Sequence, residues 1–212
     1  MTTRMTASAR WLALAFVAML AACATPDKPT RAILYDFGPG AVAPTAPQPV
    51  QPSLVLGDID ATGALDSTAL NYRLMYADAN QLRPYAQARW SAPPPQLIRQ
   101  RLREQLGRDR AVLDVSEGAS LARSSGAMPR ILRVELEEFS QIFEAEAQSF
   151  GLVRLRVTLM ENTTAGERLL AQRSVIAREP APTADAPGGV RALTAATDAA
   201  AAQIAQWLQQ QR

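Results

Sequence analysis

Two segments in the second half of the chain alternate between apolar and polar residues. Every second residue is apolar from Leu132 to Glu137, and the same period returns from Val153 to Leu159. A period of two places successive side chains on opposite faces of a β-strand. The polar positions carry mainly glutamate in the first segment and arginine in the second. We therefore expect two antiparallel strands that bury one face and form ion pairs across the other.

Other apolar runs bounded by turn residues predict further strands. They span 31–37, 53–59, 69–76, 82–90, 111–115 and 169–178, with a turn at 161–166 before the last of them. The runs 69–76 and 82–90 predict a hairpin around residues 77–80. Pro84 has no N–H to donate, which favours an edge or bulged strand for the second arm of this hairpin.

Two amphipathic segments predict helices. The first begins after Pro93–Pro95, ends near Gly107 and carries Leu97, Ile98, Leu102 and Leu106 on one side. The second covers 190–211, with an apolar stripe of Val190, Leu193, Thr197, Ala200, Ile204, Trp207 and Leu208. Loops are expected at 38–52, 116–128 and 179–189, which are rich in proline or small residues. This order predicts an α+β fold, with a mostly antiparallel sheet packed by two main helices in one domain.

Composition excludes several kinds of catalytic and binding site. Histidine is absent, Cys23 is the only cysteine and Lys28 is the only lysine. Histidine-based catalysis, internal disulfides and cysteine-clustered metal sites are therefore ruled out. The net charge is +2, which Arg4 and Arg10 supply, so the rest of the chain is neutral and nucleic-acid binding is not expected. We expect no enzyme, no cofactor and no metal. Because histidine is absent, a lipid-anchored hydrolase would need either a serine nucleophile activated by a lysine or a pair of catalytic carboxylates. Lys28 is the only lysine available for the first arrangement.

The first 22 residues have the layout of a secretory signal. Arg4 and Arg10 precede the ten-residue apolar run Trp11–Leu20, which is shorter than the roughly 20 residues of a membrane span. The sequence Leu20–Cys23 (LAAC) then resembles a bacterial lipobox. That resemblance implies cleavage before Cys23 and acylation of its sulfur and new amino group. Alanine at position 24 implies sorting to the periplasmic face of the outer membrane in a Gram-negative cell. The expected parts are a signal peptide (1–22), a lipidated tether (23–30) and the domain (31–212).

An ordered set of short motifs follows the tether. It comprises Tyr35–Pro39, Leu54–Ile59, Leu65–Asp66, Tyr72–Arg73, Leu82, Tyr85, Arg89–Trp90, Pro93–Pro95, the later pattern of Leu132, Val134, Leu136, Phe139 and Phe143, and the alanine-rich terminal helix. In this order, behind a lipobox, the chain resembles the ABC-type transport auxiliary lipoprotein family over nearly all of residues 31–210.

The resemblance implies a non-enzymatic role in lipid transport between two membranes. The implied partners are a protein with mammalian-cell-entry (MCE) domains and its inner-membrane ABC transporter, and copies of the chain itself are a further candidate. The chain would dock the periplasmic lipid conduit to the outer membrane. The alternative is another envelope assembly lipoprotein, such as a lipopolysaccharide-transport plug or a secretion-system lipoprotein.

Few residues stand out as candidates for a site. Cys23 is the expected lipid attachment site. Tyr35, Phe37, Tyr85 and Trp90 lie in the most recognisable motifs, where they either fill the core or contact a partner. Met128, Phe150 and Met160 either belong to the core or line a lipid groove. Glu135, Glu137 and Glu138 are expected on a solvated face rather than in an acid–base pair, and we assign no catalytic residue.

Overall fold

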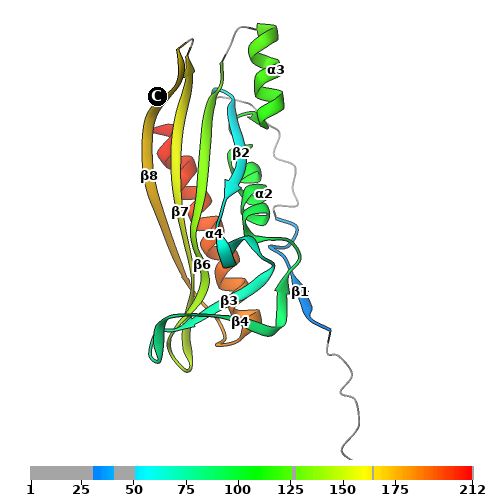
Figure 1. Cartoon of the computed structure of the whole chain (residues 1–212), viewed down its shortest axis with the longest axis vertical. Coiled ribbons are helices and arrows are strands. Elements are labelled where there is room, and N and C mark those ends of the chain that lie inside the picture. The colour runs from blue at the N-terminus through cyan, green and yellow to red at the C-terminus, as the bar shows by residue number, and fades with distance from the viewer. Residues whose placement is uncertain (1–30, 41–50, 126–127, 164, 212) are drawn as a thin grey trace, which may run out of the picture. The chain divides into compact units, whose positions relative to one another are not determined.

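A computed structural model describes residues 31–40, 51–125, 128–163 and 165–211. The elements, in chain order, are β1 (Ile33–Tyr35), β2 (Leu54–Asp60), the 3-10 helix η1 (Gly63–Asp66), β3 (Ala69–Leu74), β4 (Asp78–Trp90), α2 (Pro94–Leu106), β5 (Val112–Leu113), α3 (Val115–Ser125), β6 (Arg130–Ala145), β7 (Gln148–Thr163), β8 (Gly166–Pro180) and α4 (Ala186–Gln209) (Figure 1). The segments predicted as signal peptide (1–22) and tether (23–30) and residues 41–50 of the proline-rich segment lie outside the described residues. Residues 32–212 cluster as one unit, so the α+β single-domain prediction is confirmed.

Strand β6 organises the sheet. Its one edge pairs antiparallel with β7, and β7 pairs antiparallel with β8. Its other edge is shared, because β2 runs parallel to its first part and β3 runs parallel to its last part. Strand β4 pairs antiparallel with β3, and the short strands β1 and β5 join β4 and β2 in parallel. The longest pairings are antiparallel, as expected, but four short parallel pairings accompany them.

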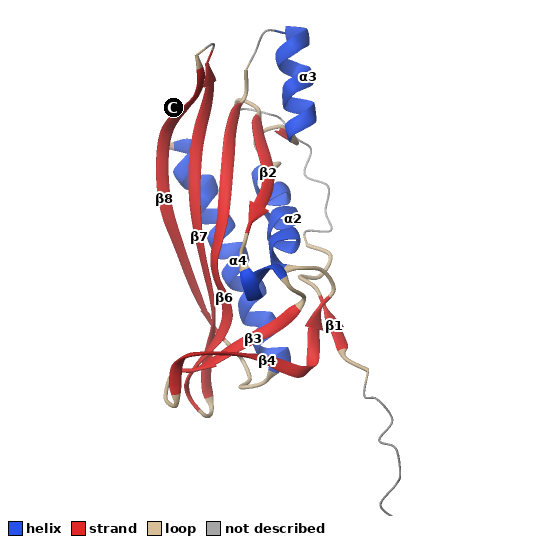
Figure 2. Ribbon diagram, viewed as in Figure 1, coloured by secondary structure: helices blue, strands red, loops and turns tan. Residues whose placement is uncertain are grey.

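The two predicted helices cover one face of this sheet. Helix α4 lies along β7 and β8, and α2 packs between α4 and β2 (Figure 2). Every residue of the apolar stripe predicted for 190–211 is buried, and so are the four apolar residues predicted for the first helix. The strand face beneath them is equally buried, at Leu132, Val134, Leu136, Val153, Leu155, Val157 and Leu159. The core therefore lies between the helices and the inward faces of β6 and β7.

The opposite face of β6 and β7 carries the predicted ion pairs. Arg154 Nε lies 3.1 Å from Glu137 Oε2. Arg156 also forms an ion pair with Glu137 and lies 3.7 Å from Glu135. On the neighbouring strand, Arg73 contacts Glu138 at 3.1 Å. Each of these glutamates has a guanidinium partner, so this is a charge-balanced outer face rather than a carboxylate pair.

The loop predicted at 116–128 is wrong, because residues 115–125 form α3. The N–H of Glu117 donates to Asp114 Oδ1 at 2.8 Å, and the N–H of Asp114 donates to Glu117 Oε2 at 2.7 Å. This reciprocal arrangement is a capping box, and it satisfies N–H groups at the start of the helix that have no partner within it. The small residues that suggested a loop also let α3 approach β2 closely, since Gly118 faces Val55.

The loop predicted at 179–189 is also wrong at both ends. Strand β8 continues to Pro180, and α4 begins at Ala186 rather than at Val190. Asp185 caps the helix, because its Oδ1 accepts the N–H of Gly188 at 2.8 Å. Pro187 fits the first turn, where a missing N–H costs no helical hydrogen bond.

Smaller differences concern the ends of strands. The first predicted strand is limited to Ile33–Tyr35 and the strand at 111–115 to two residues, while β4 begins at Asp78 inside the predicted turn. Pro84 lies opposite Asn71 beside a shift in the β3–β4 register, as expected for a bulged strand. None of the described helices has the length and apolar character needed to cross a membrane.

Candidate functional site

Two of the four candidate aromatic residues lie in the core. Trp90, at the end of β4, is 1% exposed, and Phe37, just after β1, is buried beside it. Their ring centroids are 5.4 Å apart in an edge-to-face arrangement, and Phe139 of β6 lies 5.5 Å from Trp90. Both residues therefore fill the core, which is one of the two roles considered for them. Contact with a partner stays a prediction for them.

The two tyrosines are only partly buried. Tyr35 pairs with Trp90 in the β1–β4 ladder, and its carbonyl accepts the N–H of Ser91 at 2.7 Å. The hydroxyl of Tyr85 donates to Gln141 Oε1 at 2.8 Å, and its ring lies 4.7 Å from that of Tyr72. Burial, followed by the nearby Tyr72 and Asp185, raises the pKa of Tyr85 far above its usual value. The phenol is therefore held neutral. Both tyrosines remain candidates for partner contact.

Strand β1 presents apolar side chains to solvent. Ile33 is 57% exposed and Leu34 is 65% exposed. The strand lies at the end of the sheet and pairs with β4 along one edge only. The sequence pattern had indicated only the neighbouring aromatic residues, Tyr35 and Phe37, as candidates at this edge.

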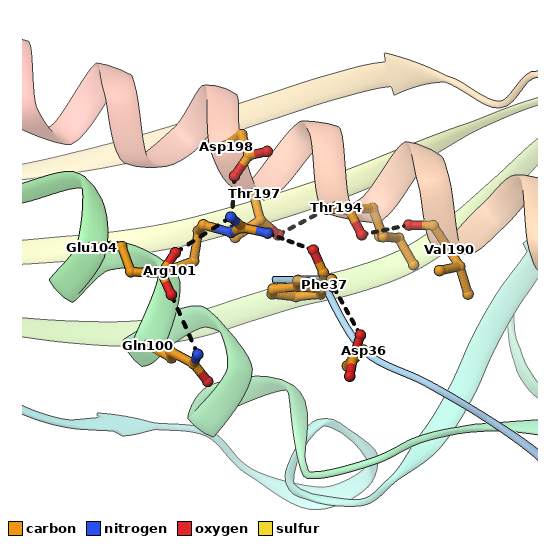
Figure 3. Close-up of polar contacts among 11 residues, drawn as sticks. Asp36, Phe37, Gln100, Arg101, Glu104, Val190, Thr194, Thr197 and Asp198 are labelled. Atoms are coloured by element: carbon orange, nitrogen blue, oxygen red, sulfur yellow. Dashed lines mark hydrogen bonds and ion pairs between the residues drawn. The ribbon is translucent and has the colours of Figure 1, made fainter. Parts of the chain in front are cut away.

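Arg101 of α2 joins three parts of the chain (Figure 3). Its Nη2 donates to the carbonyl of Phe37 at 2.6 Å, and its Nε lies 3.1 Å from Asp198 Oδ1 on α4. Its Nη1 lies 3.4 Å from Glu104 Oε2 on the same helix. The guanidinium is thus engaged on all three nitrogens and holds the segment after β1 against both helices. It lines a polar cleft of about 940 Å³, but we assign it a structural rather than a ligand-binding role.

A second cleft, of about 490 Å³, lies where several elements begin or end. Its lining is drawn from residues 51–54, Arg110, residues 128–130, Leu159, Glu161, Leu208 and Gln211. Met128 and Pro129 also line a third cleft, of about 410 Å³, next to α3. Met128 is 51% exposed and lines both clefts, so it does not belong to the core, whereas contact with a lipid stays a prediction. The remaining lining residues come from distant segments, and no local sequence pattern indicates them.

The expected lipid attachment site is not among the described residues. Cys23 lies outside them, so lipid attachment stays a prediction. No cluster of three or more acidic side chains that could hold a metal occurs in the part of the chain that the structure describes.

Comparison with solved structures supports the fold. A crystal structure of a protein from Xanthomonas campestris aligns with a TM-score of 0.63 and 15% identity, covering 84% of this chain and 92% of that one. The crystal structure of another, uncharacterized protein aligns with a TM-score of 0.58 and 14% identity, covering 84% of this chain and 99% of that one. No curated protein matches the chain in sequence.

The sequence itself matches a protein family over most of its length. Residues 35–205 match the family described as ABC-type transport auxiliary lipoprotein component. This range begins at the last residue of β1 and ends four residues before the end of α4, so it includes β2 to β8, all of α2 and most of α4. The chain therefore belongs to the ABC-type transport auxiliary lipoprotein family.

Proposed function

We propose that the chain is the outer-membrane lipoprotein of an MCE-type lipid transport system and docks the periplasmic lipid conduit to that membrane. The observation that carries this proposal is the family match over residues 35–205, which makes the chain an auxiliary component of ABC-type transport. The MCE-domain partner and the outer membrane come from the resemblance described above. The proposed role is non-enzymatic and needs no cofactor.

The expected anchor would keep the domain close to the membrane. Three acyl chains on Cys23 would contribute roughly 0.8 kcal/mol for each buried methylene, which makes the attachment effectively permanent. Nine residues lie between Cys23 and Ile33, so β1 would lie ten residue steps, or at most about 36 Å, from the anchor. The exposed Ile33 and Leu34 would then face the membrane surface or a partner assembled there.

The first test is a pull-down of the full-length, lipidated protein in a gentle detergent, with mass spectrometry of the eluted proteins. We expect an MCE-domain protein, together with subunits of an ABC transporter. An outer-membrane β-barrel without any MCE protein would refute the proposal and favour the lipopolysaccharide-transport plug.

The membrane assignment has its own test in sucrose-gradient fractionation. The native chain should sediment with the outer membrane. Cys23→Ser should abolish acylation and release the protein from both membranes. Ala24→Asp is the matched control, because it keeps the anchor and should retain the protein in the inner membrane. Native protein in inner-membrane fractions would contradict the proposed location.

A further inference from the structure

We propose that the cleft of about 490 Å³ at the start of β2 and β6 binds one fatty acid, with the acyl chain in the cleft and the carboxylate at Arg110. The volume falls within the range of about 300–1,000 Å³ that is typical of small-molecule sites. A cleft of this size suits one acyl chain better than a two-chain phospholipid. The proposal deepens the proposed function, because it gives the chain itself a lipid to hold.

The depth of the cleft is apolar. Leu54 of β2, Leu159 of β7 and Leu208 of α4 are 2%, 1% and 6% exposed, and they come from three separate elements. Pro129 is buried beside them, whereas Met128 is 51% exposed. An unbranched thioether adapts its shape to a flexible ligand. Together these side chains provide a wall for hydrocarbon, with Met128 at its solvent side.

The lining also contains a buried cation whose hydrogen bonds are incomplete. Arg110 follows α2 and is only 7% exposed. Its Nε donates to Asp109 Oδ1 at 3.1 Å, but its Nη2 is buried and has no hydrogen-bond partner among the described residues. Leaving a buried charged donor without an acceptor is costly, so this position favours a ligand that supplies an oxygen.

The charge of the remaining lining favours an anion as well. Arg130 is a second guanidinium on the cleft, and its Nη1 donates to the carbonyl of Gln211. Glu161 is the one carboxylate on the lining, and Arg168 already pairs with it. Arginine binds carboxylates through short, charge-assisted hydrogen bonds in a planar geometry. Asp109 engages only Nε of Arg110, so an apolar wall beside two guanidiniums, one with an unpartnered Nη2, is complementary to a long-chain carboxylate.

Calorimetric titration with dodecanoate tests the site. The protein is the mature chain, residues 23–212, carrying Cys23→Ser so that no acyl chain of its own competes for the cleft. We expect saturable binding of one dodecanoate per chain, weaker binding of uncharged dodecyl maltoside by about tenfold or more, and no binding of acetate. Comparing these three ligands separates the contribution of the acyl chain to binding from that of the carboxylate charge.

Variants locate the binding. Arg110→Gln should weaken dodecanoate binding by about tenfold or more, and Arg110→Lys should restore part of it. Arg108→Gln is the matched control, because Arg108 is exposed two residues away and lines the polar cleft instead; it should leave binding unchanged. If Arg110→Gln does not fold, the exposed Met128 provides a second pair: Met128→Glu should weaken binding and Met128→Lys should strengthen it.

Three results would overturn the inference. The first is the absence of saturable dodecanoate binding. The second is equal affinity for dodecanoate and dodecyl maltoside. The third is binding that neither Arg110→Gln nor Met128→Glu changes. The proposed function fails separately. If the protein binds dodecanoate but captures no MCE protein, the proposed docking role fails and this site stands. If it captures the MCE protein but does not bind dodecanoate, this site fails and the proposed docking role stands.

Discussion

Replacing Gly151 by alanine tests how closely α4 approaches the sheet. Gly151 lies in β7, and a Cβ atom there would stand 2.6 Å from the carbonyl carbon of Ala192 and 2.6 Å from the nitrogen of Leu193. Both are backbone atoms of α4, which cannot rotate away as a side chain does. Carbon atoms in contact normally lie about 3.5–4.0 Å apart. The helix would therefore have to move away by about 1 Å.

The expected cost follows from this displacement. Overpacking of a core costs about 1–3 kcal/mol, whereas replacing a strand glycine by alanine returns about 0.5–1 kcal/mol of backbone entropy. We expect a net loss of about 1–2 kcal/mol in the free energy of unfolding. For a domain of this size, each 1 kcal/mol shifts Tm by about 2–4 °C, so Tm should fall by about 2–8 °C.

Thermal unfolding followed by circular dichroism, together with urea unfolding, measures this loss. The control is Gly57→Ala in β2, since a Cβ at Gly57 would meet nothing within 4 Å. We expect this control to be neutral or slightly stabilising. The reasoning is refuted if Gly151→Ala unfolds at the native temperature, or if both variants lose the same stability.

Three further perturbations follow from individual contacts. Trp90→Ala should lower the free energy of unfolding by about 3–5 kcal/mol in urea, because it empties a buried ring site; unchanged stability with lost capture of the MCE protein would instead make Trp90 a partner contact. Burial raises the pKa of Tyr85, so the folded state keeps a proton that the unfolded state loses above its ordinary value of 10.0. Native stability should therefore fall as pH rises above 10, and Tyr85→Phe should remove that component; identical alkaline profiles would contradict it. Hydrogen bonds from Glu117 N–H and Ser116 lower the pKa of Asp114 below 3.8, so its cap stabilises α3 above that pH and is lost as pH falls through the lower value. Asp114→Ala should speed amide exchange in the first turn of α3 at neutral pH, and unchanged exchange there would argue against the cap.

The errors of sequence interpretation have identifiable causes. Residues 116–128 were expected to be a loop on composition, yet Asp114 and Glu117 stand at the spacing of a capping box, which is a local signal for a helix. The start of α4 was placed too late because Pro187, Gly188 and Gly189 usually mark loops. Asp185 caps the helix before them, and the glycines give close approach to neighbouring segments, with Gly189 packed against Gln141.

The candidate site shows the same division between local and long-range information. The aromatic residues were recognisable from sequence, but their orientation was not. Phe37 and Trp90 are buried only because β1 pairs with β4 and Phe139 arrives from β6. The lining of the 490 Å³ cleft comes from five separate stretches of the chain, and Arg110 differs in no local respect from the exposed Arg108.

By itself, the sequence determined the type of most elements and which of their faces is buried. Periods of two and 3.6 are local properties of the backbone, and they required no knowledge of which segments meet. Tertiary structure alone decided that β2 and β3 share one edge of β6 and that Arg110 is enclosed beside an apolar wall. Such features depend on contacts between residues far apart in the chain, and the burial and hydrogen bonding of each group are settled only when those segments pack together.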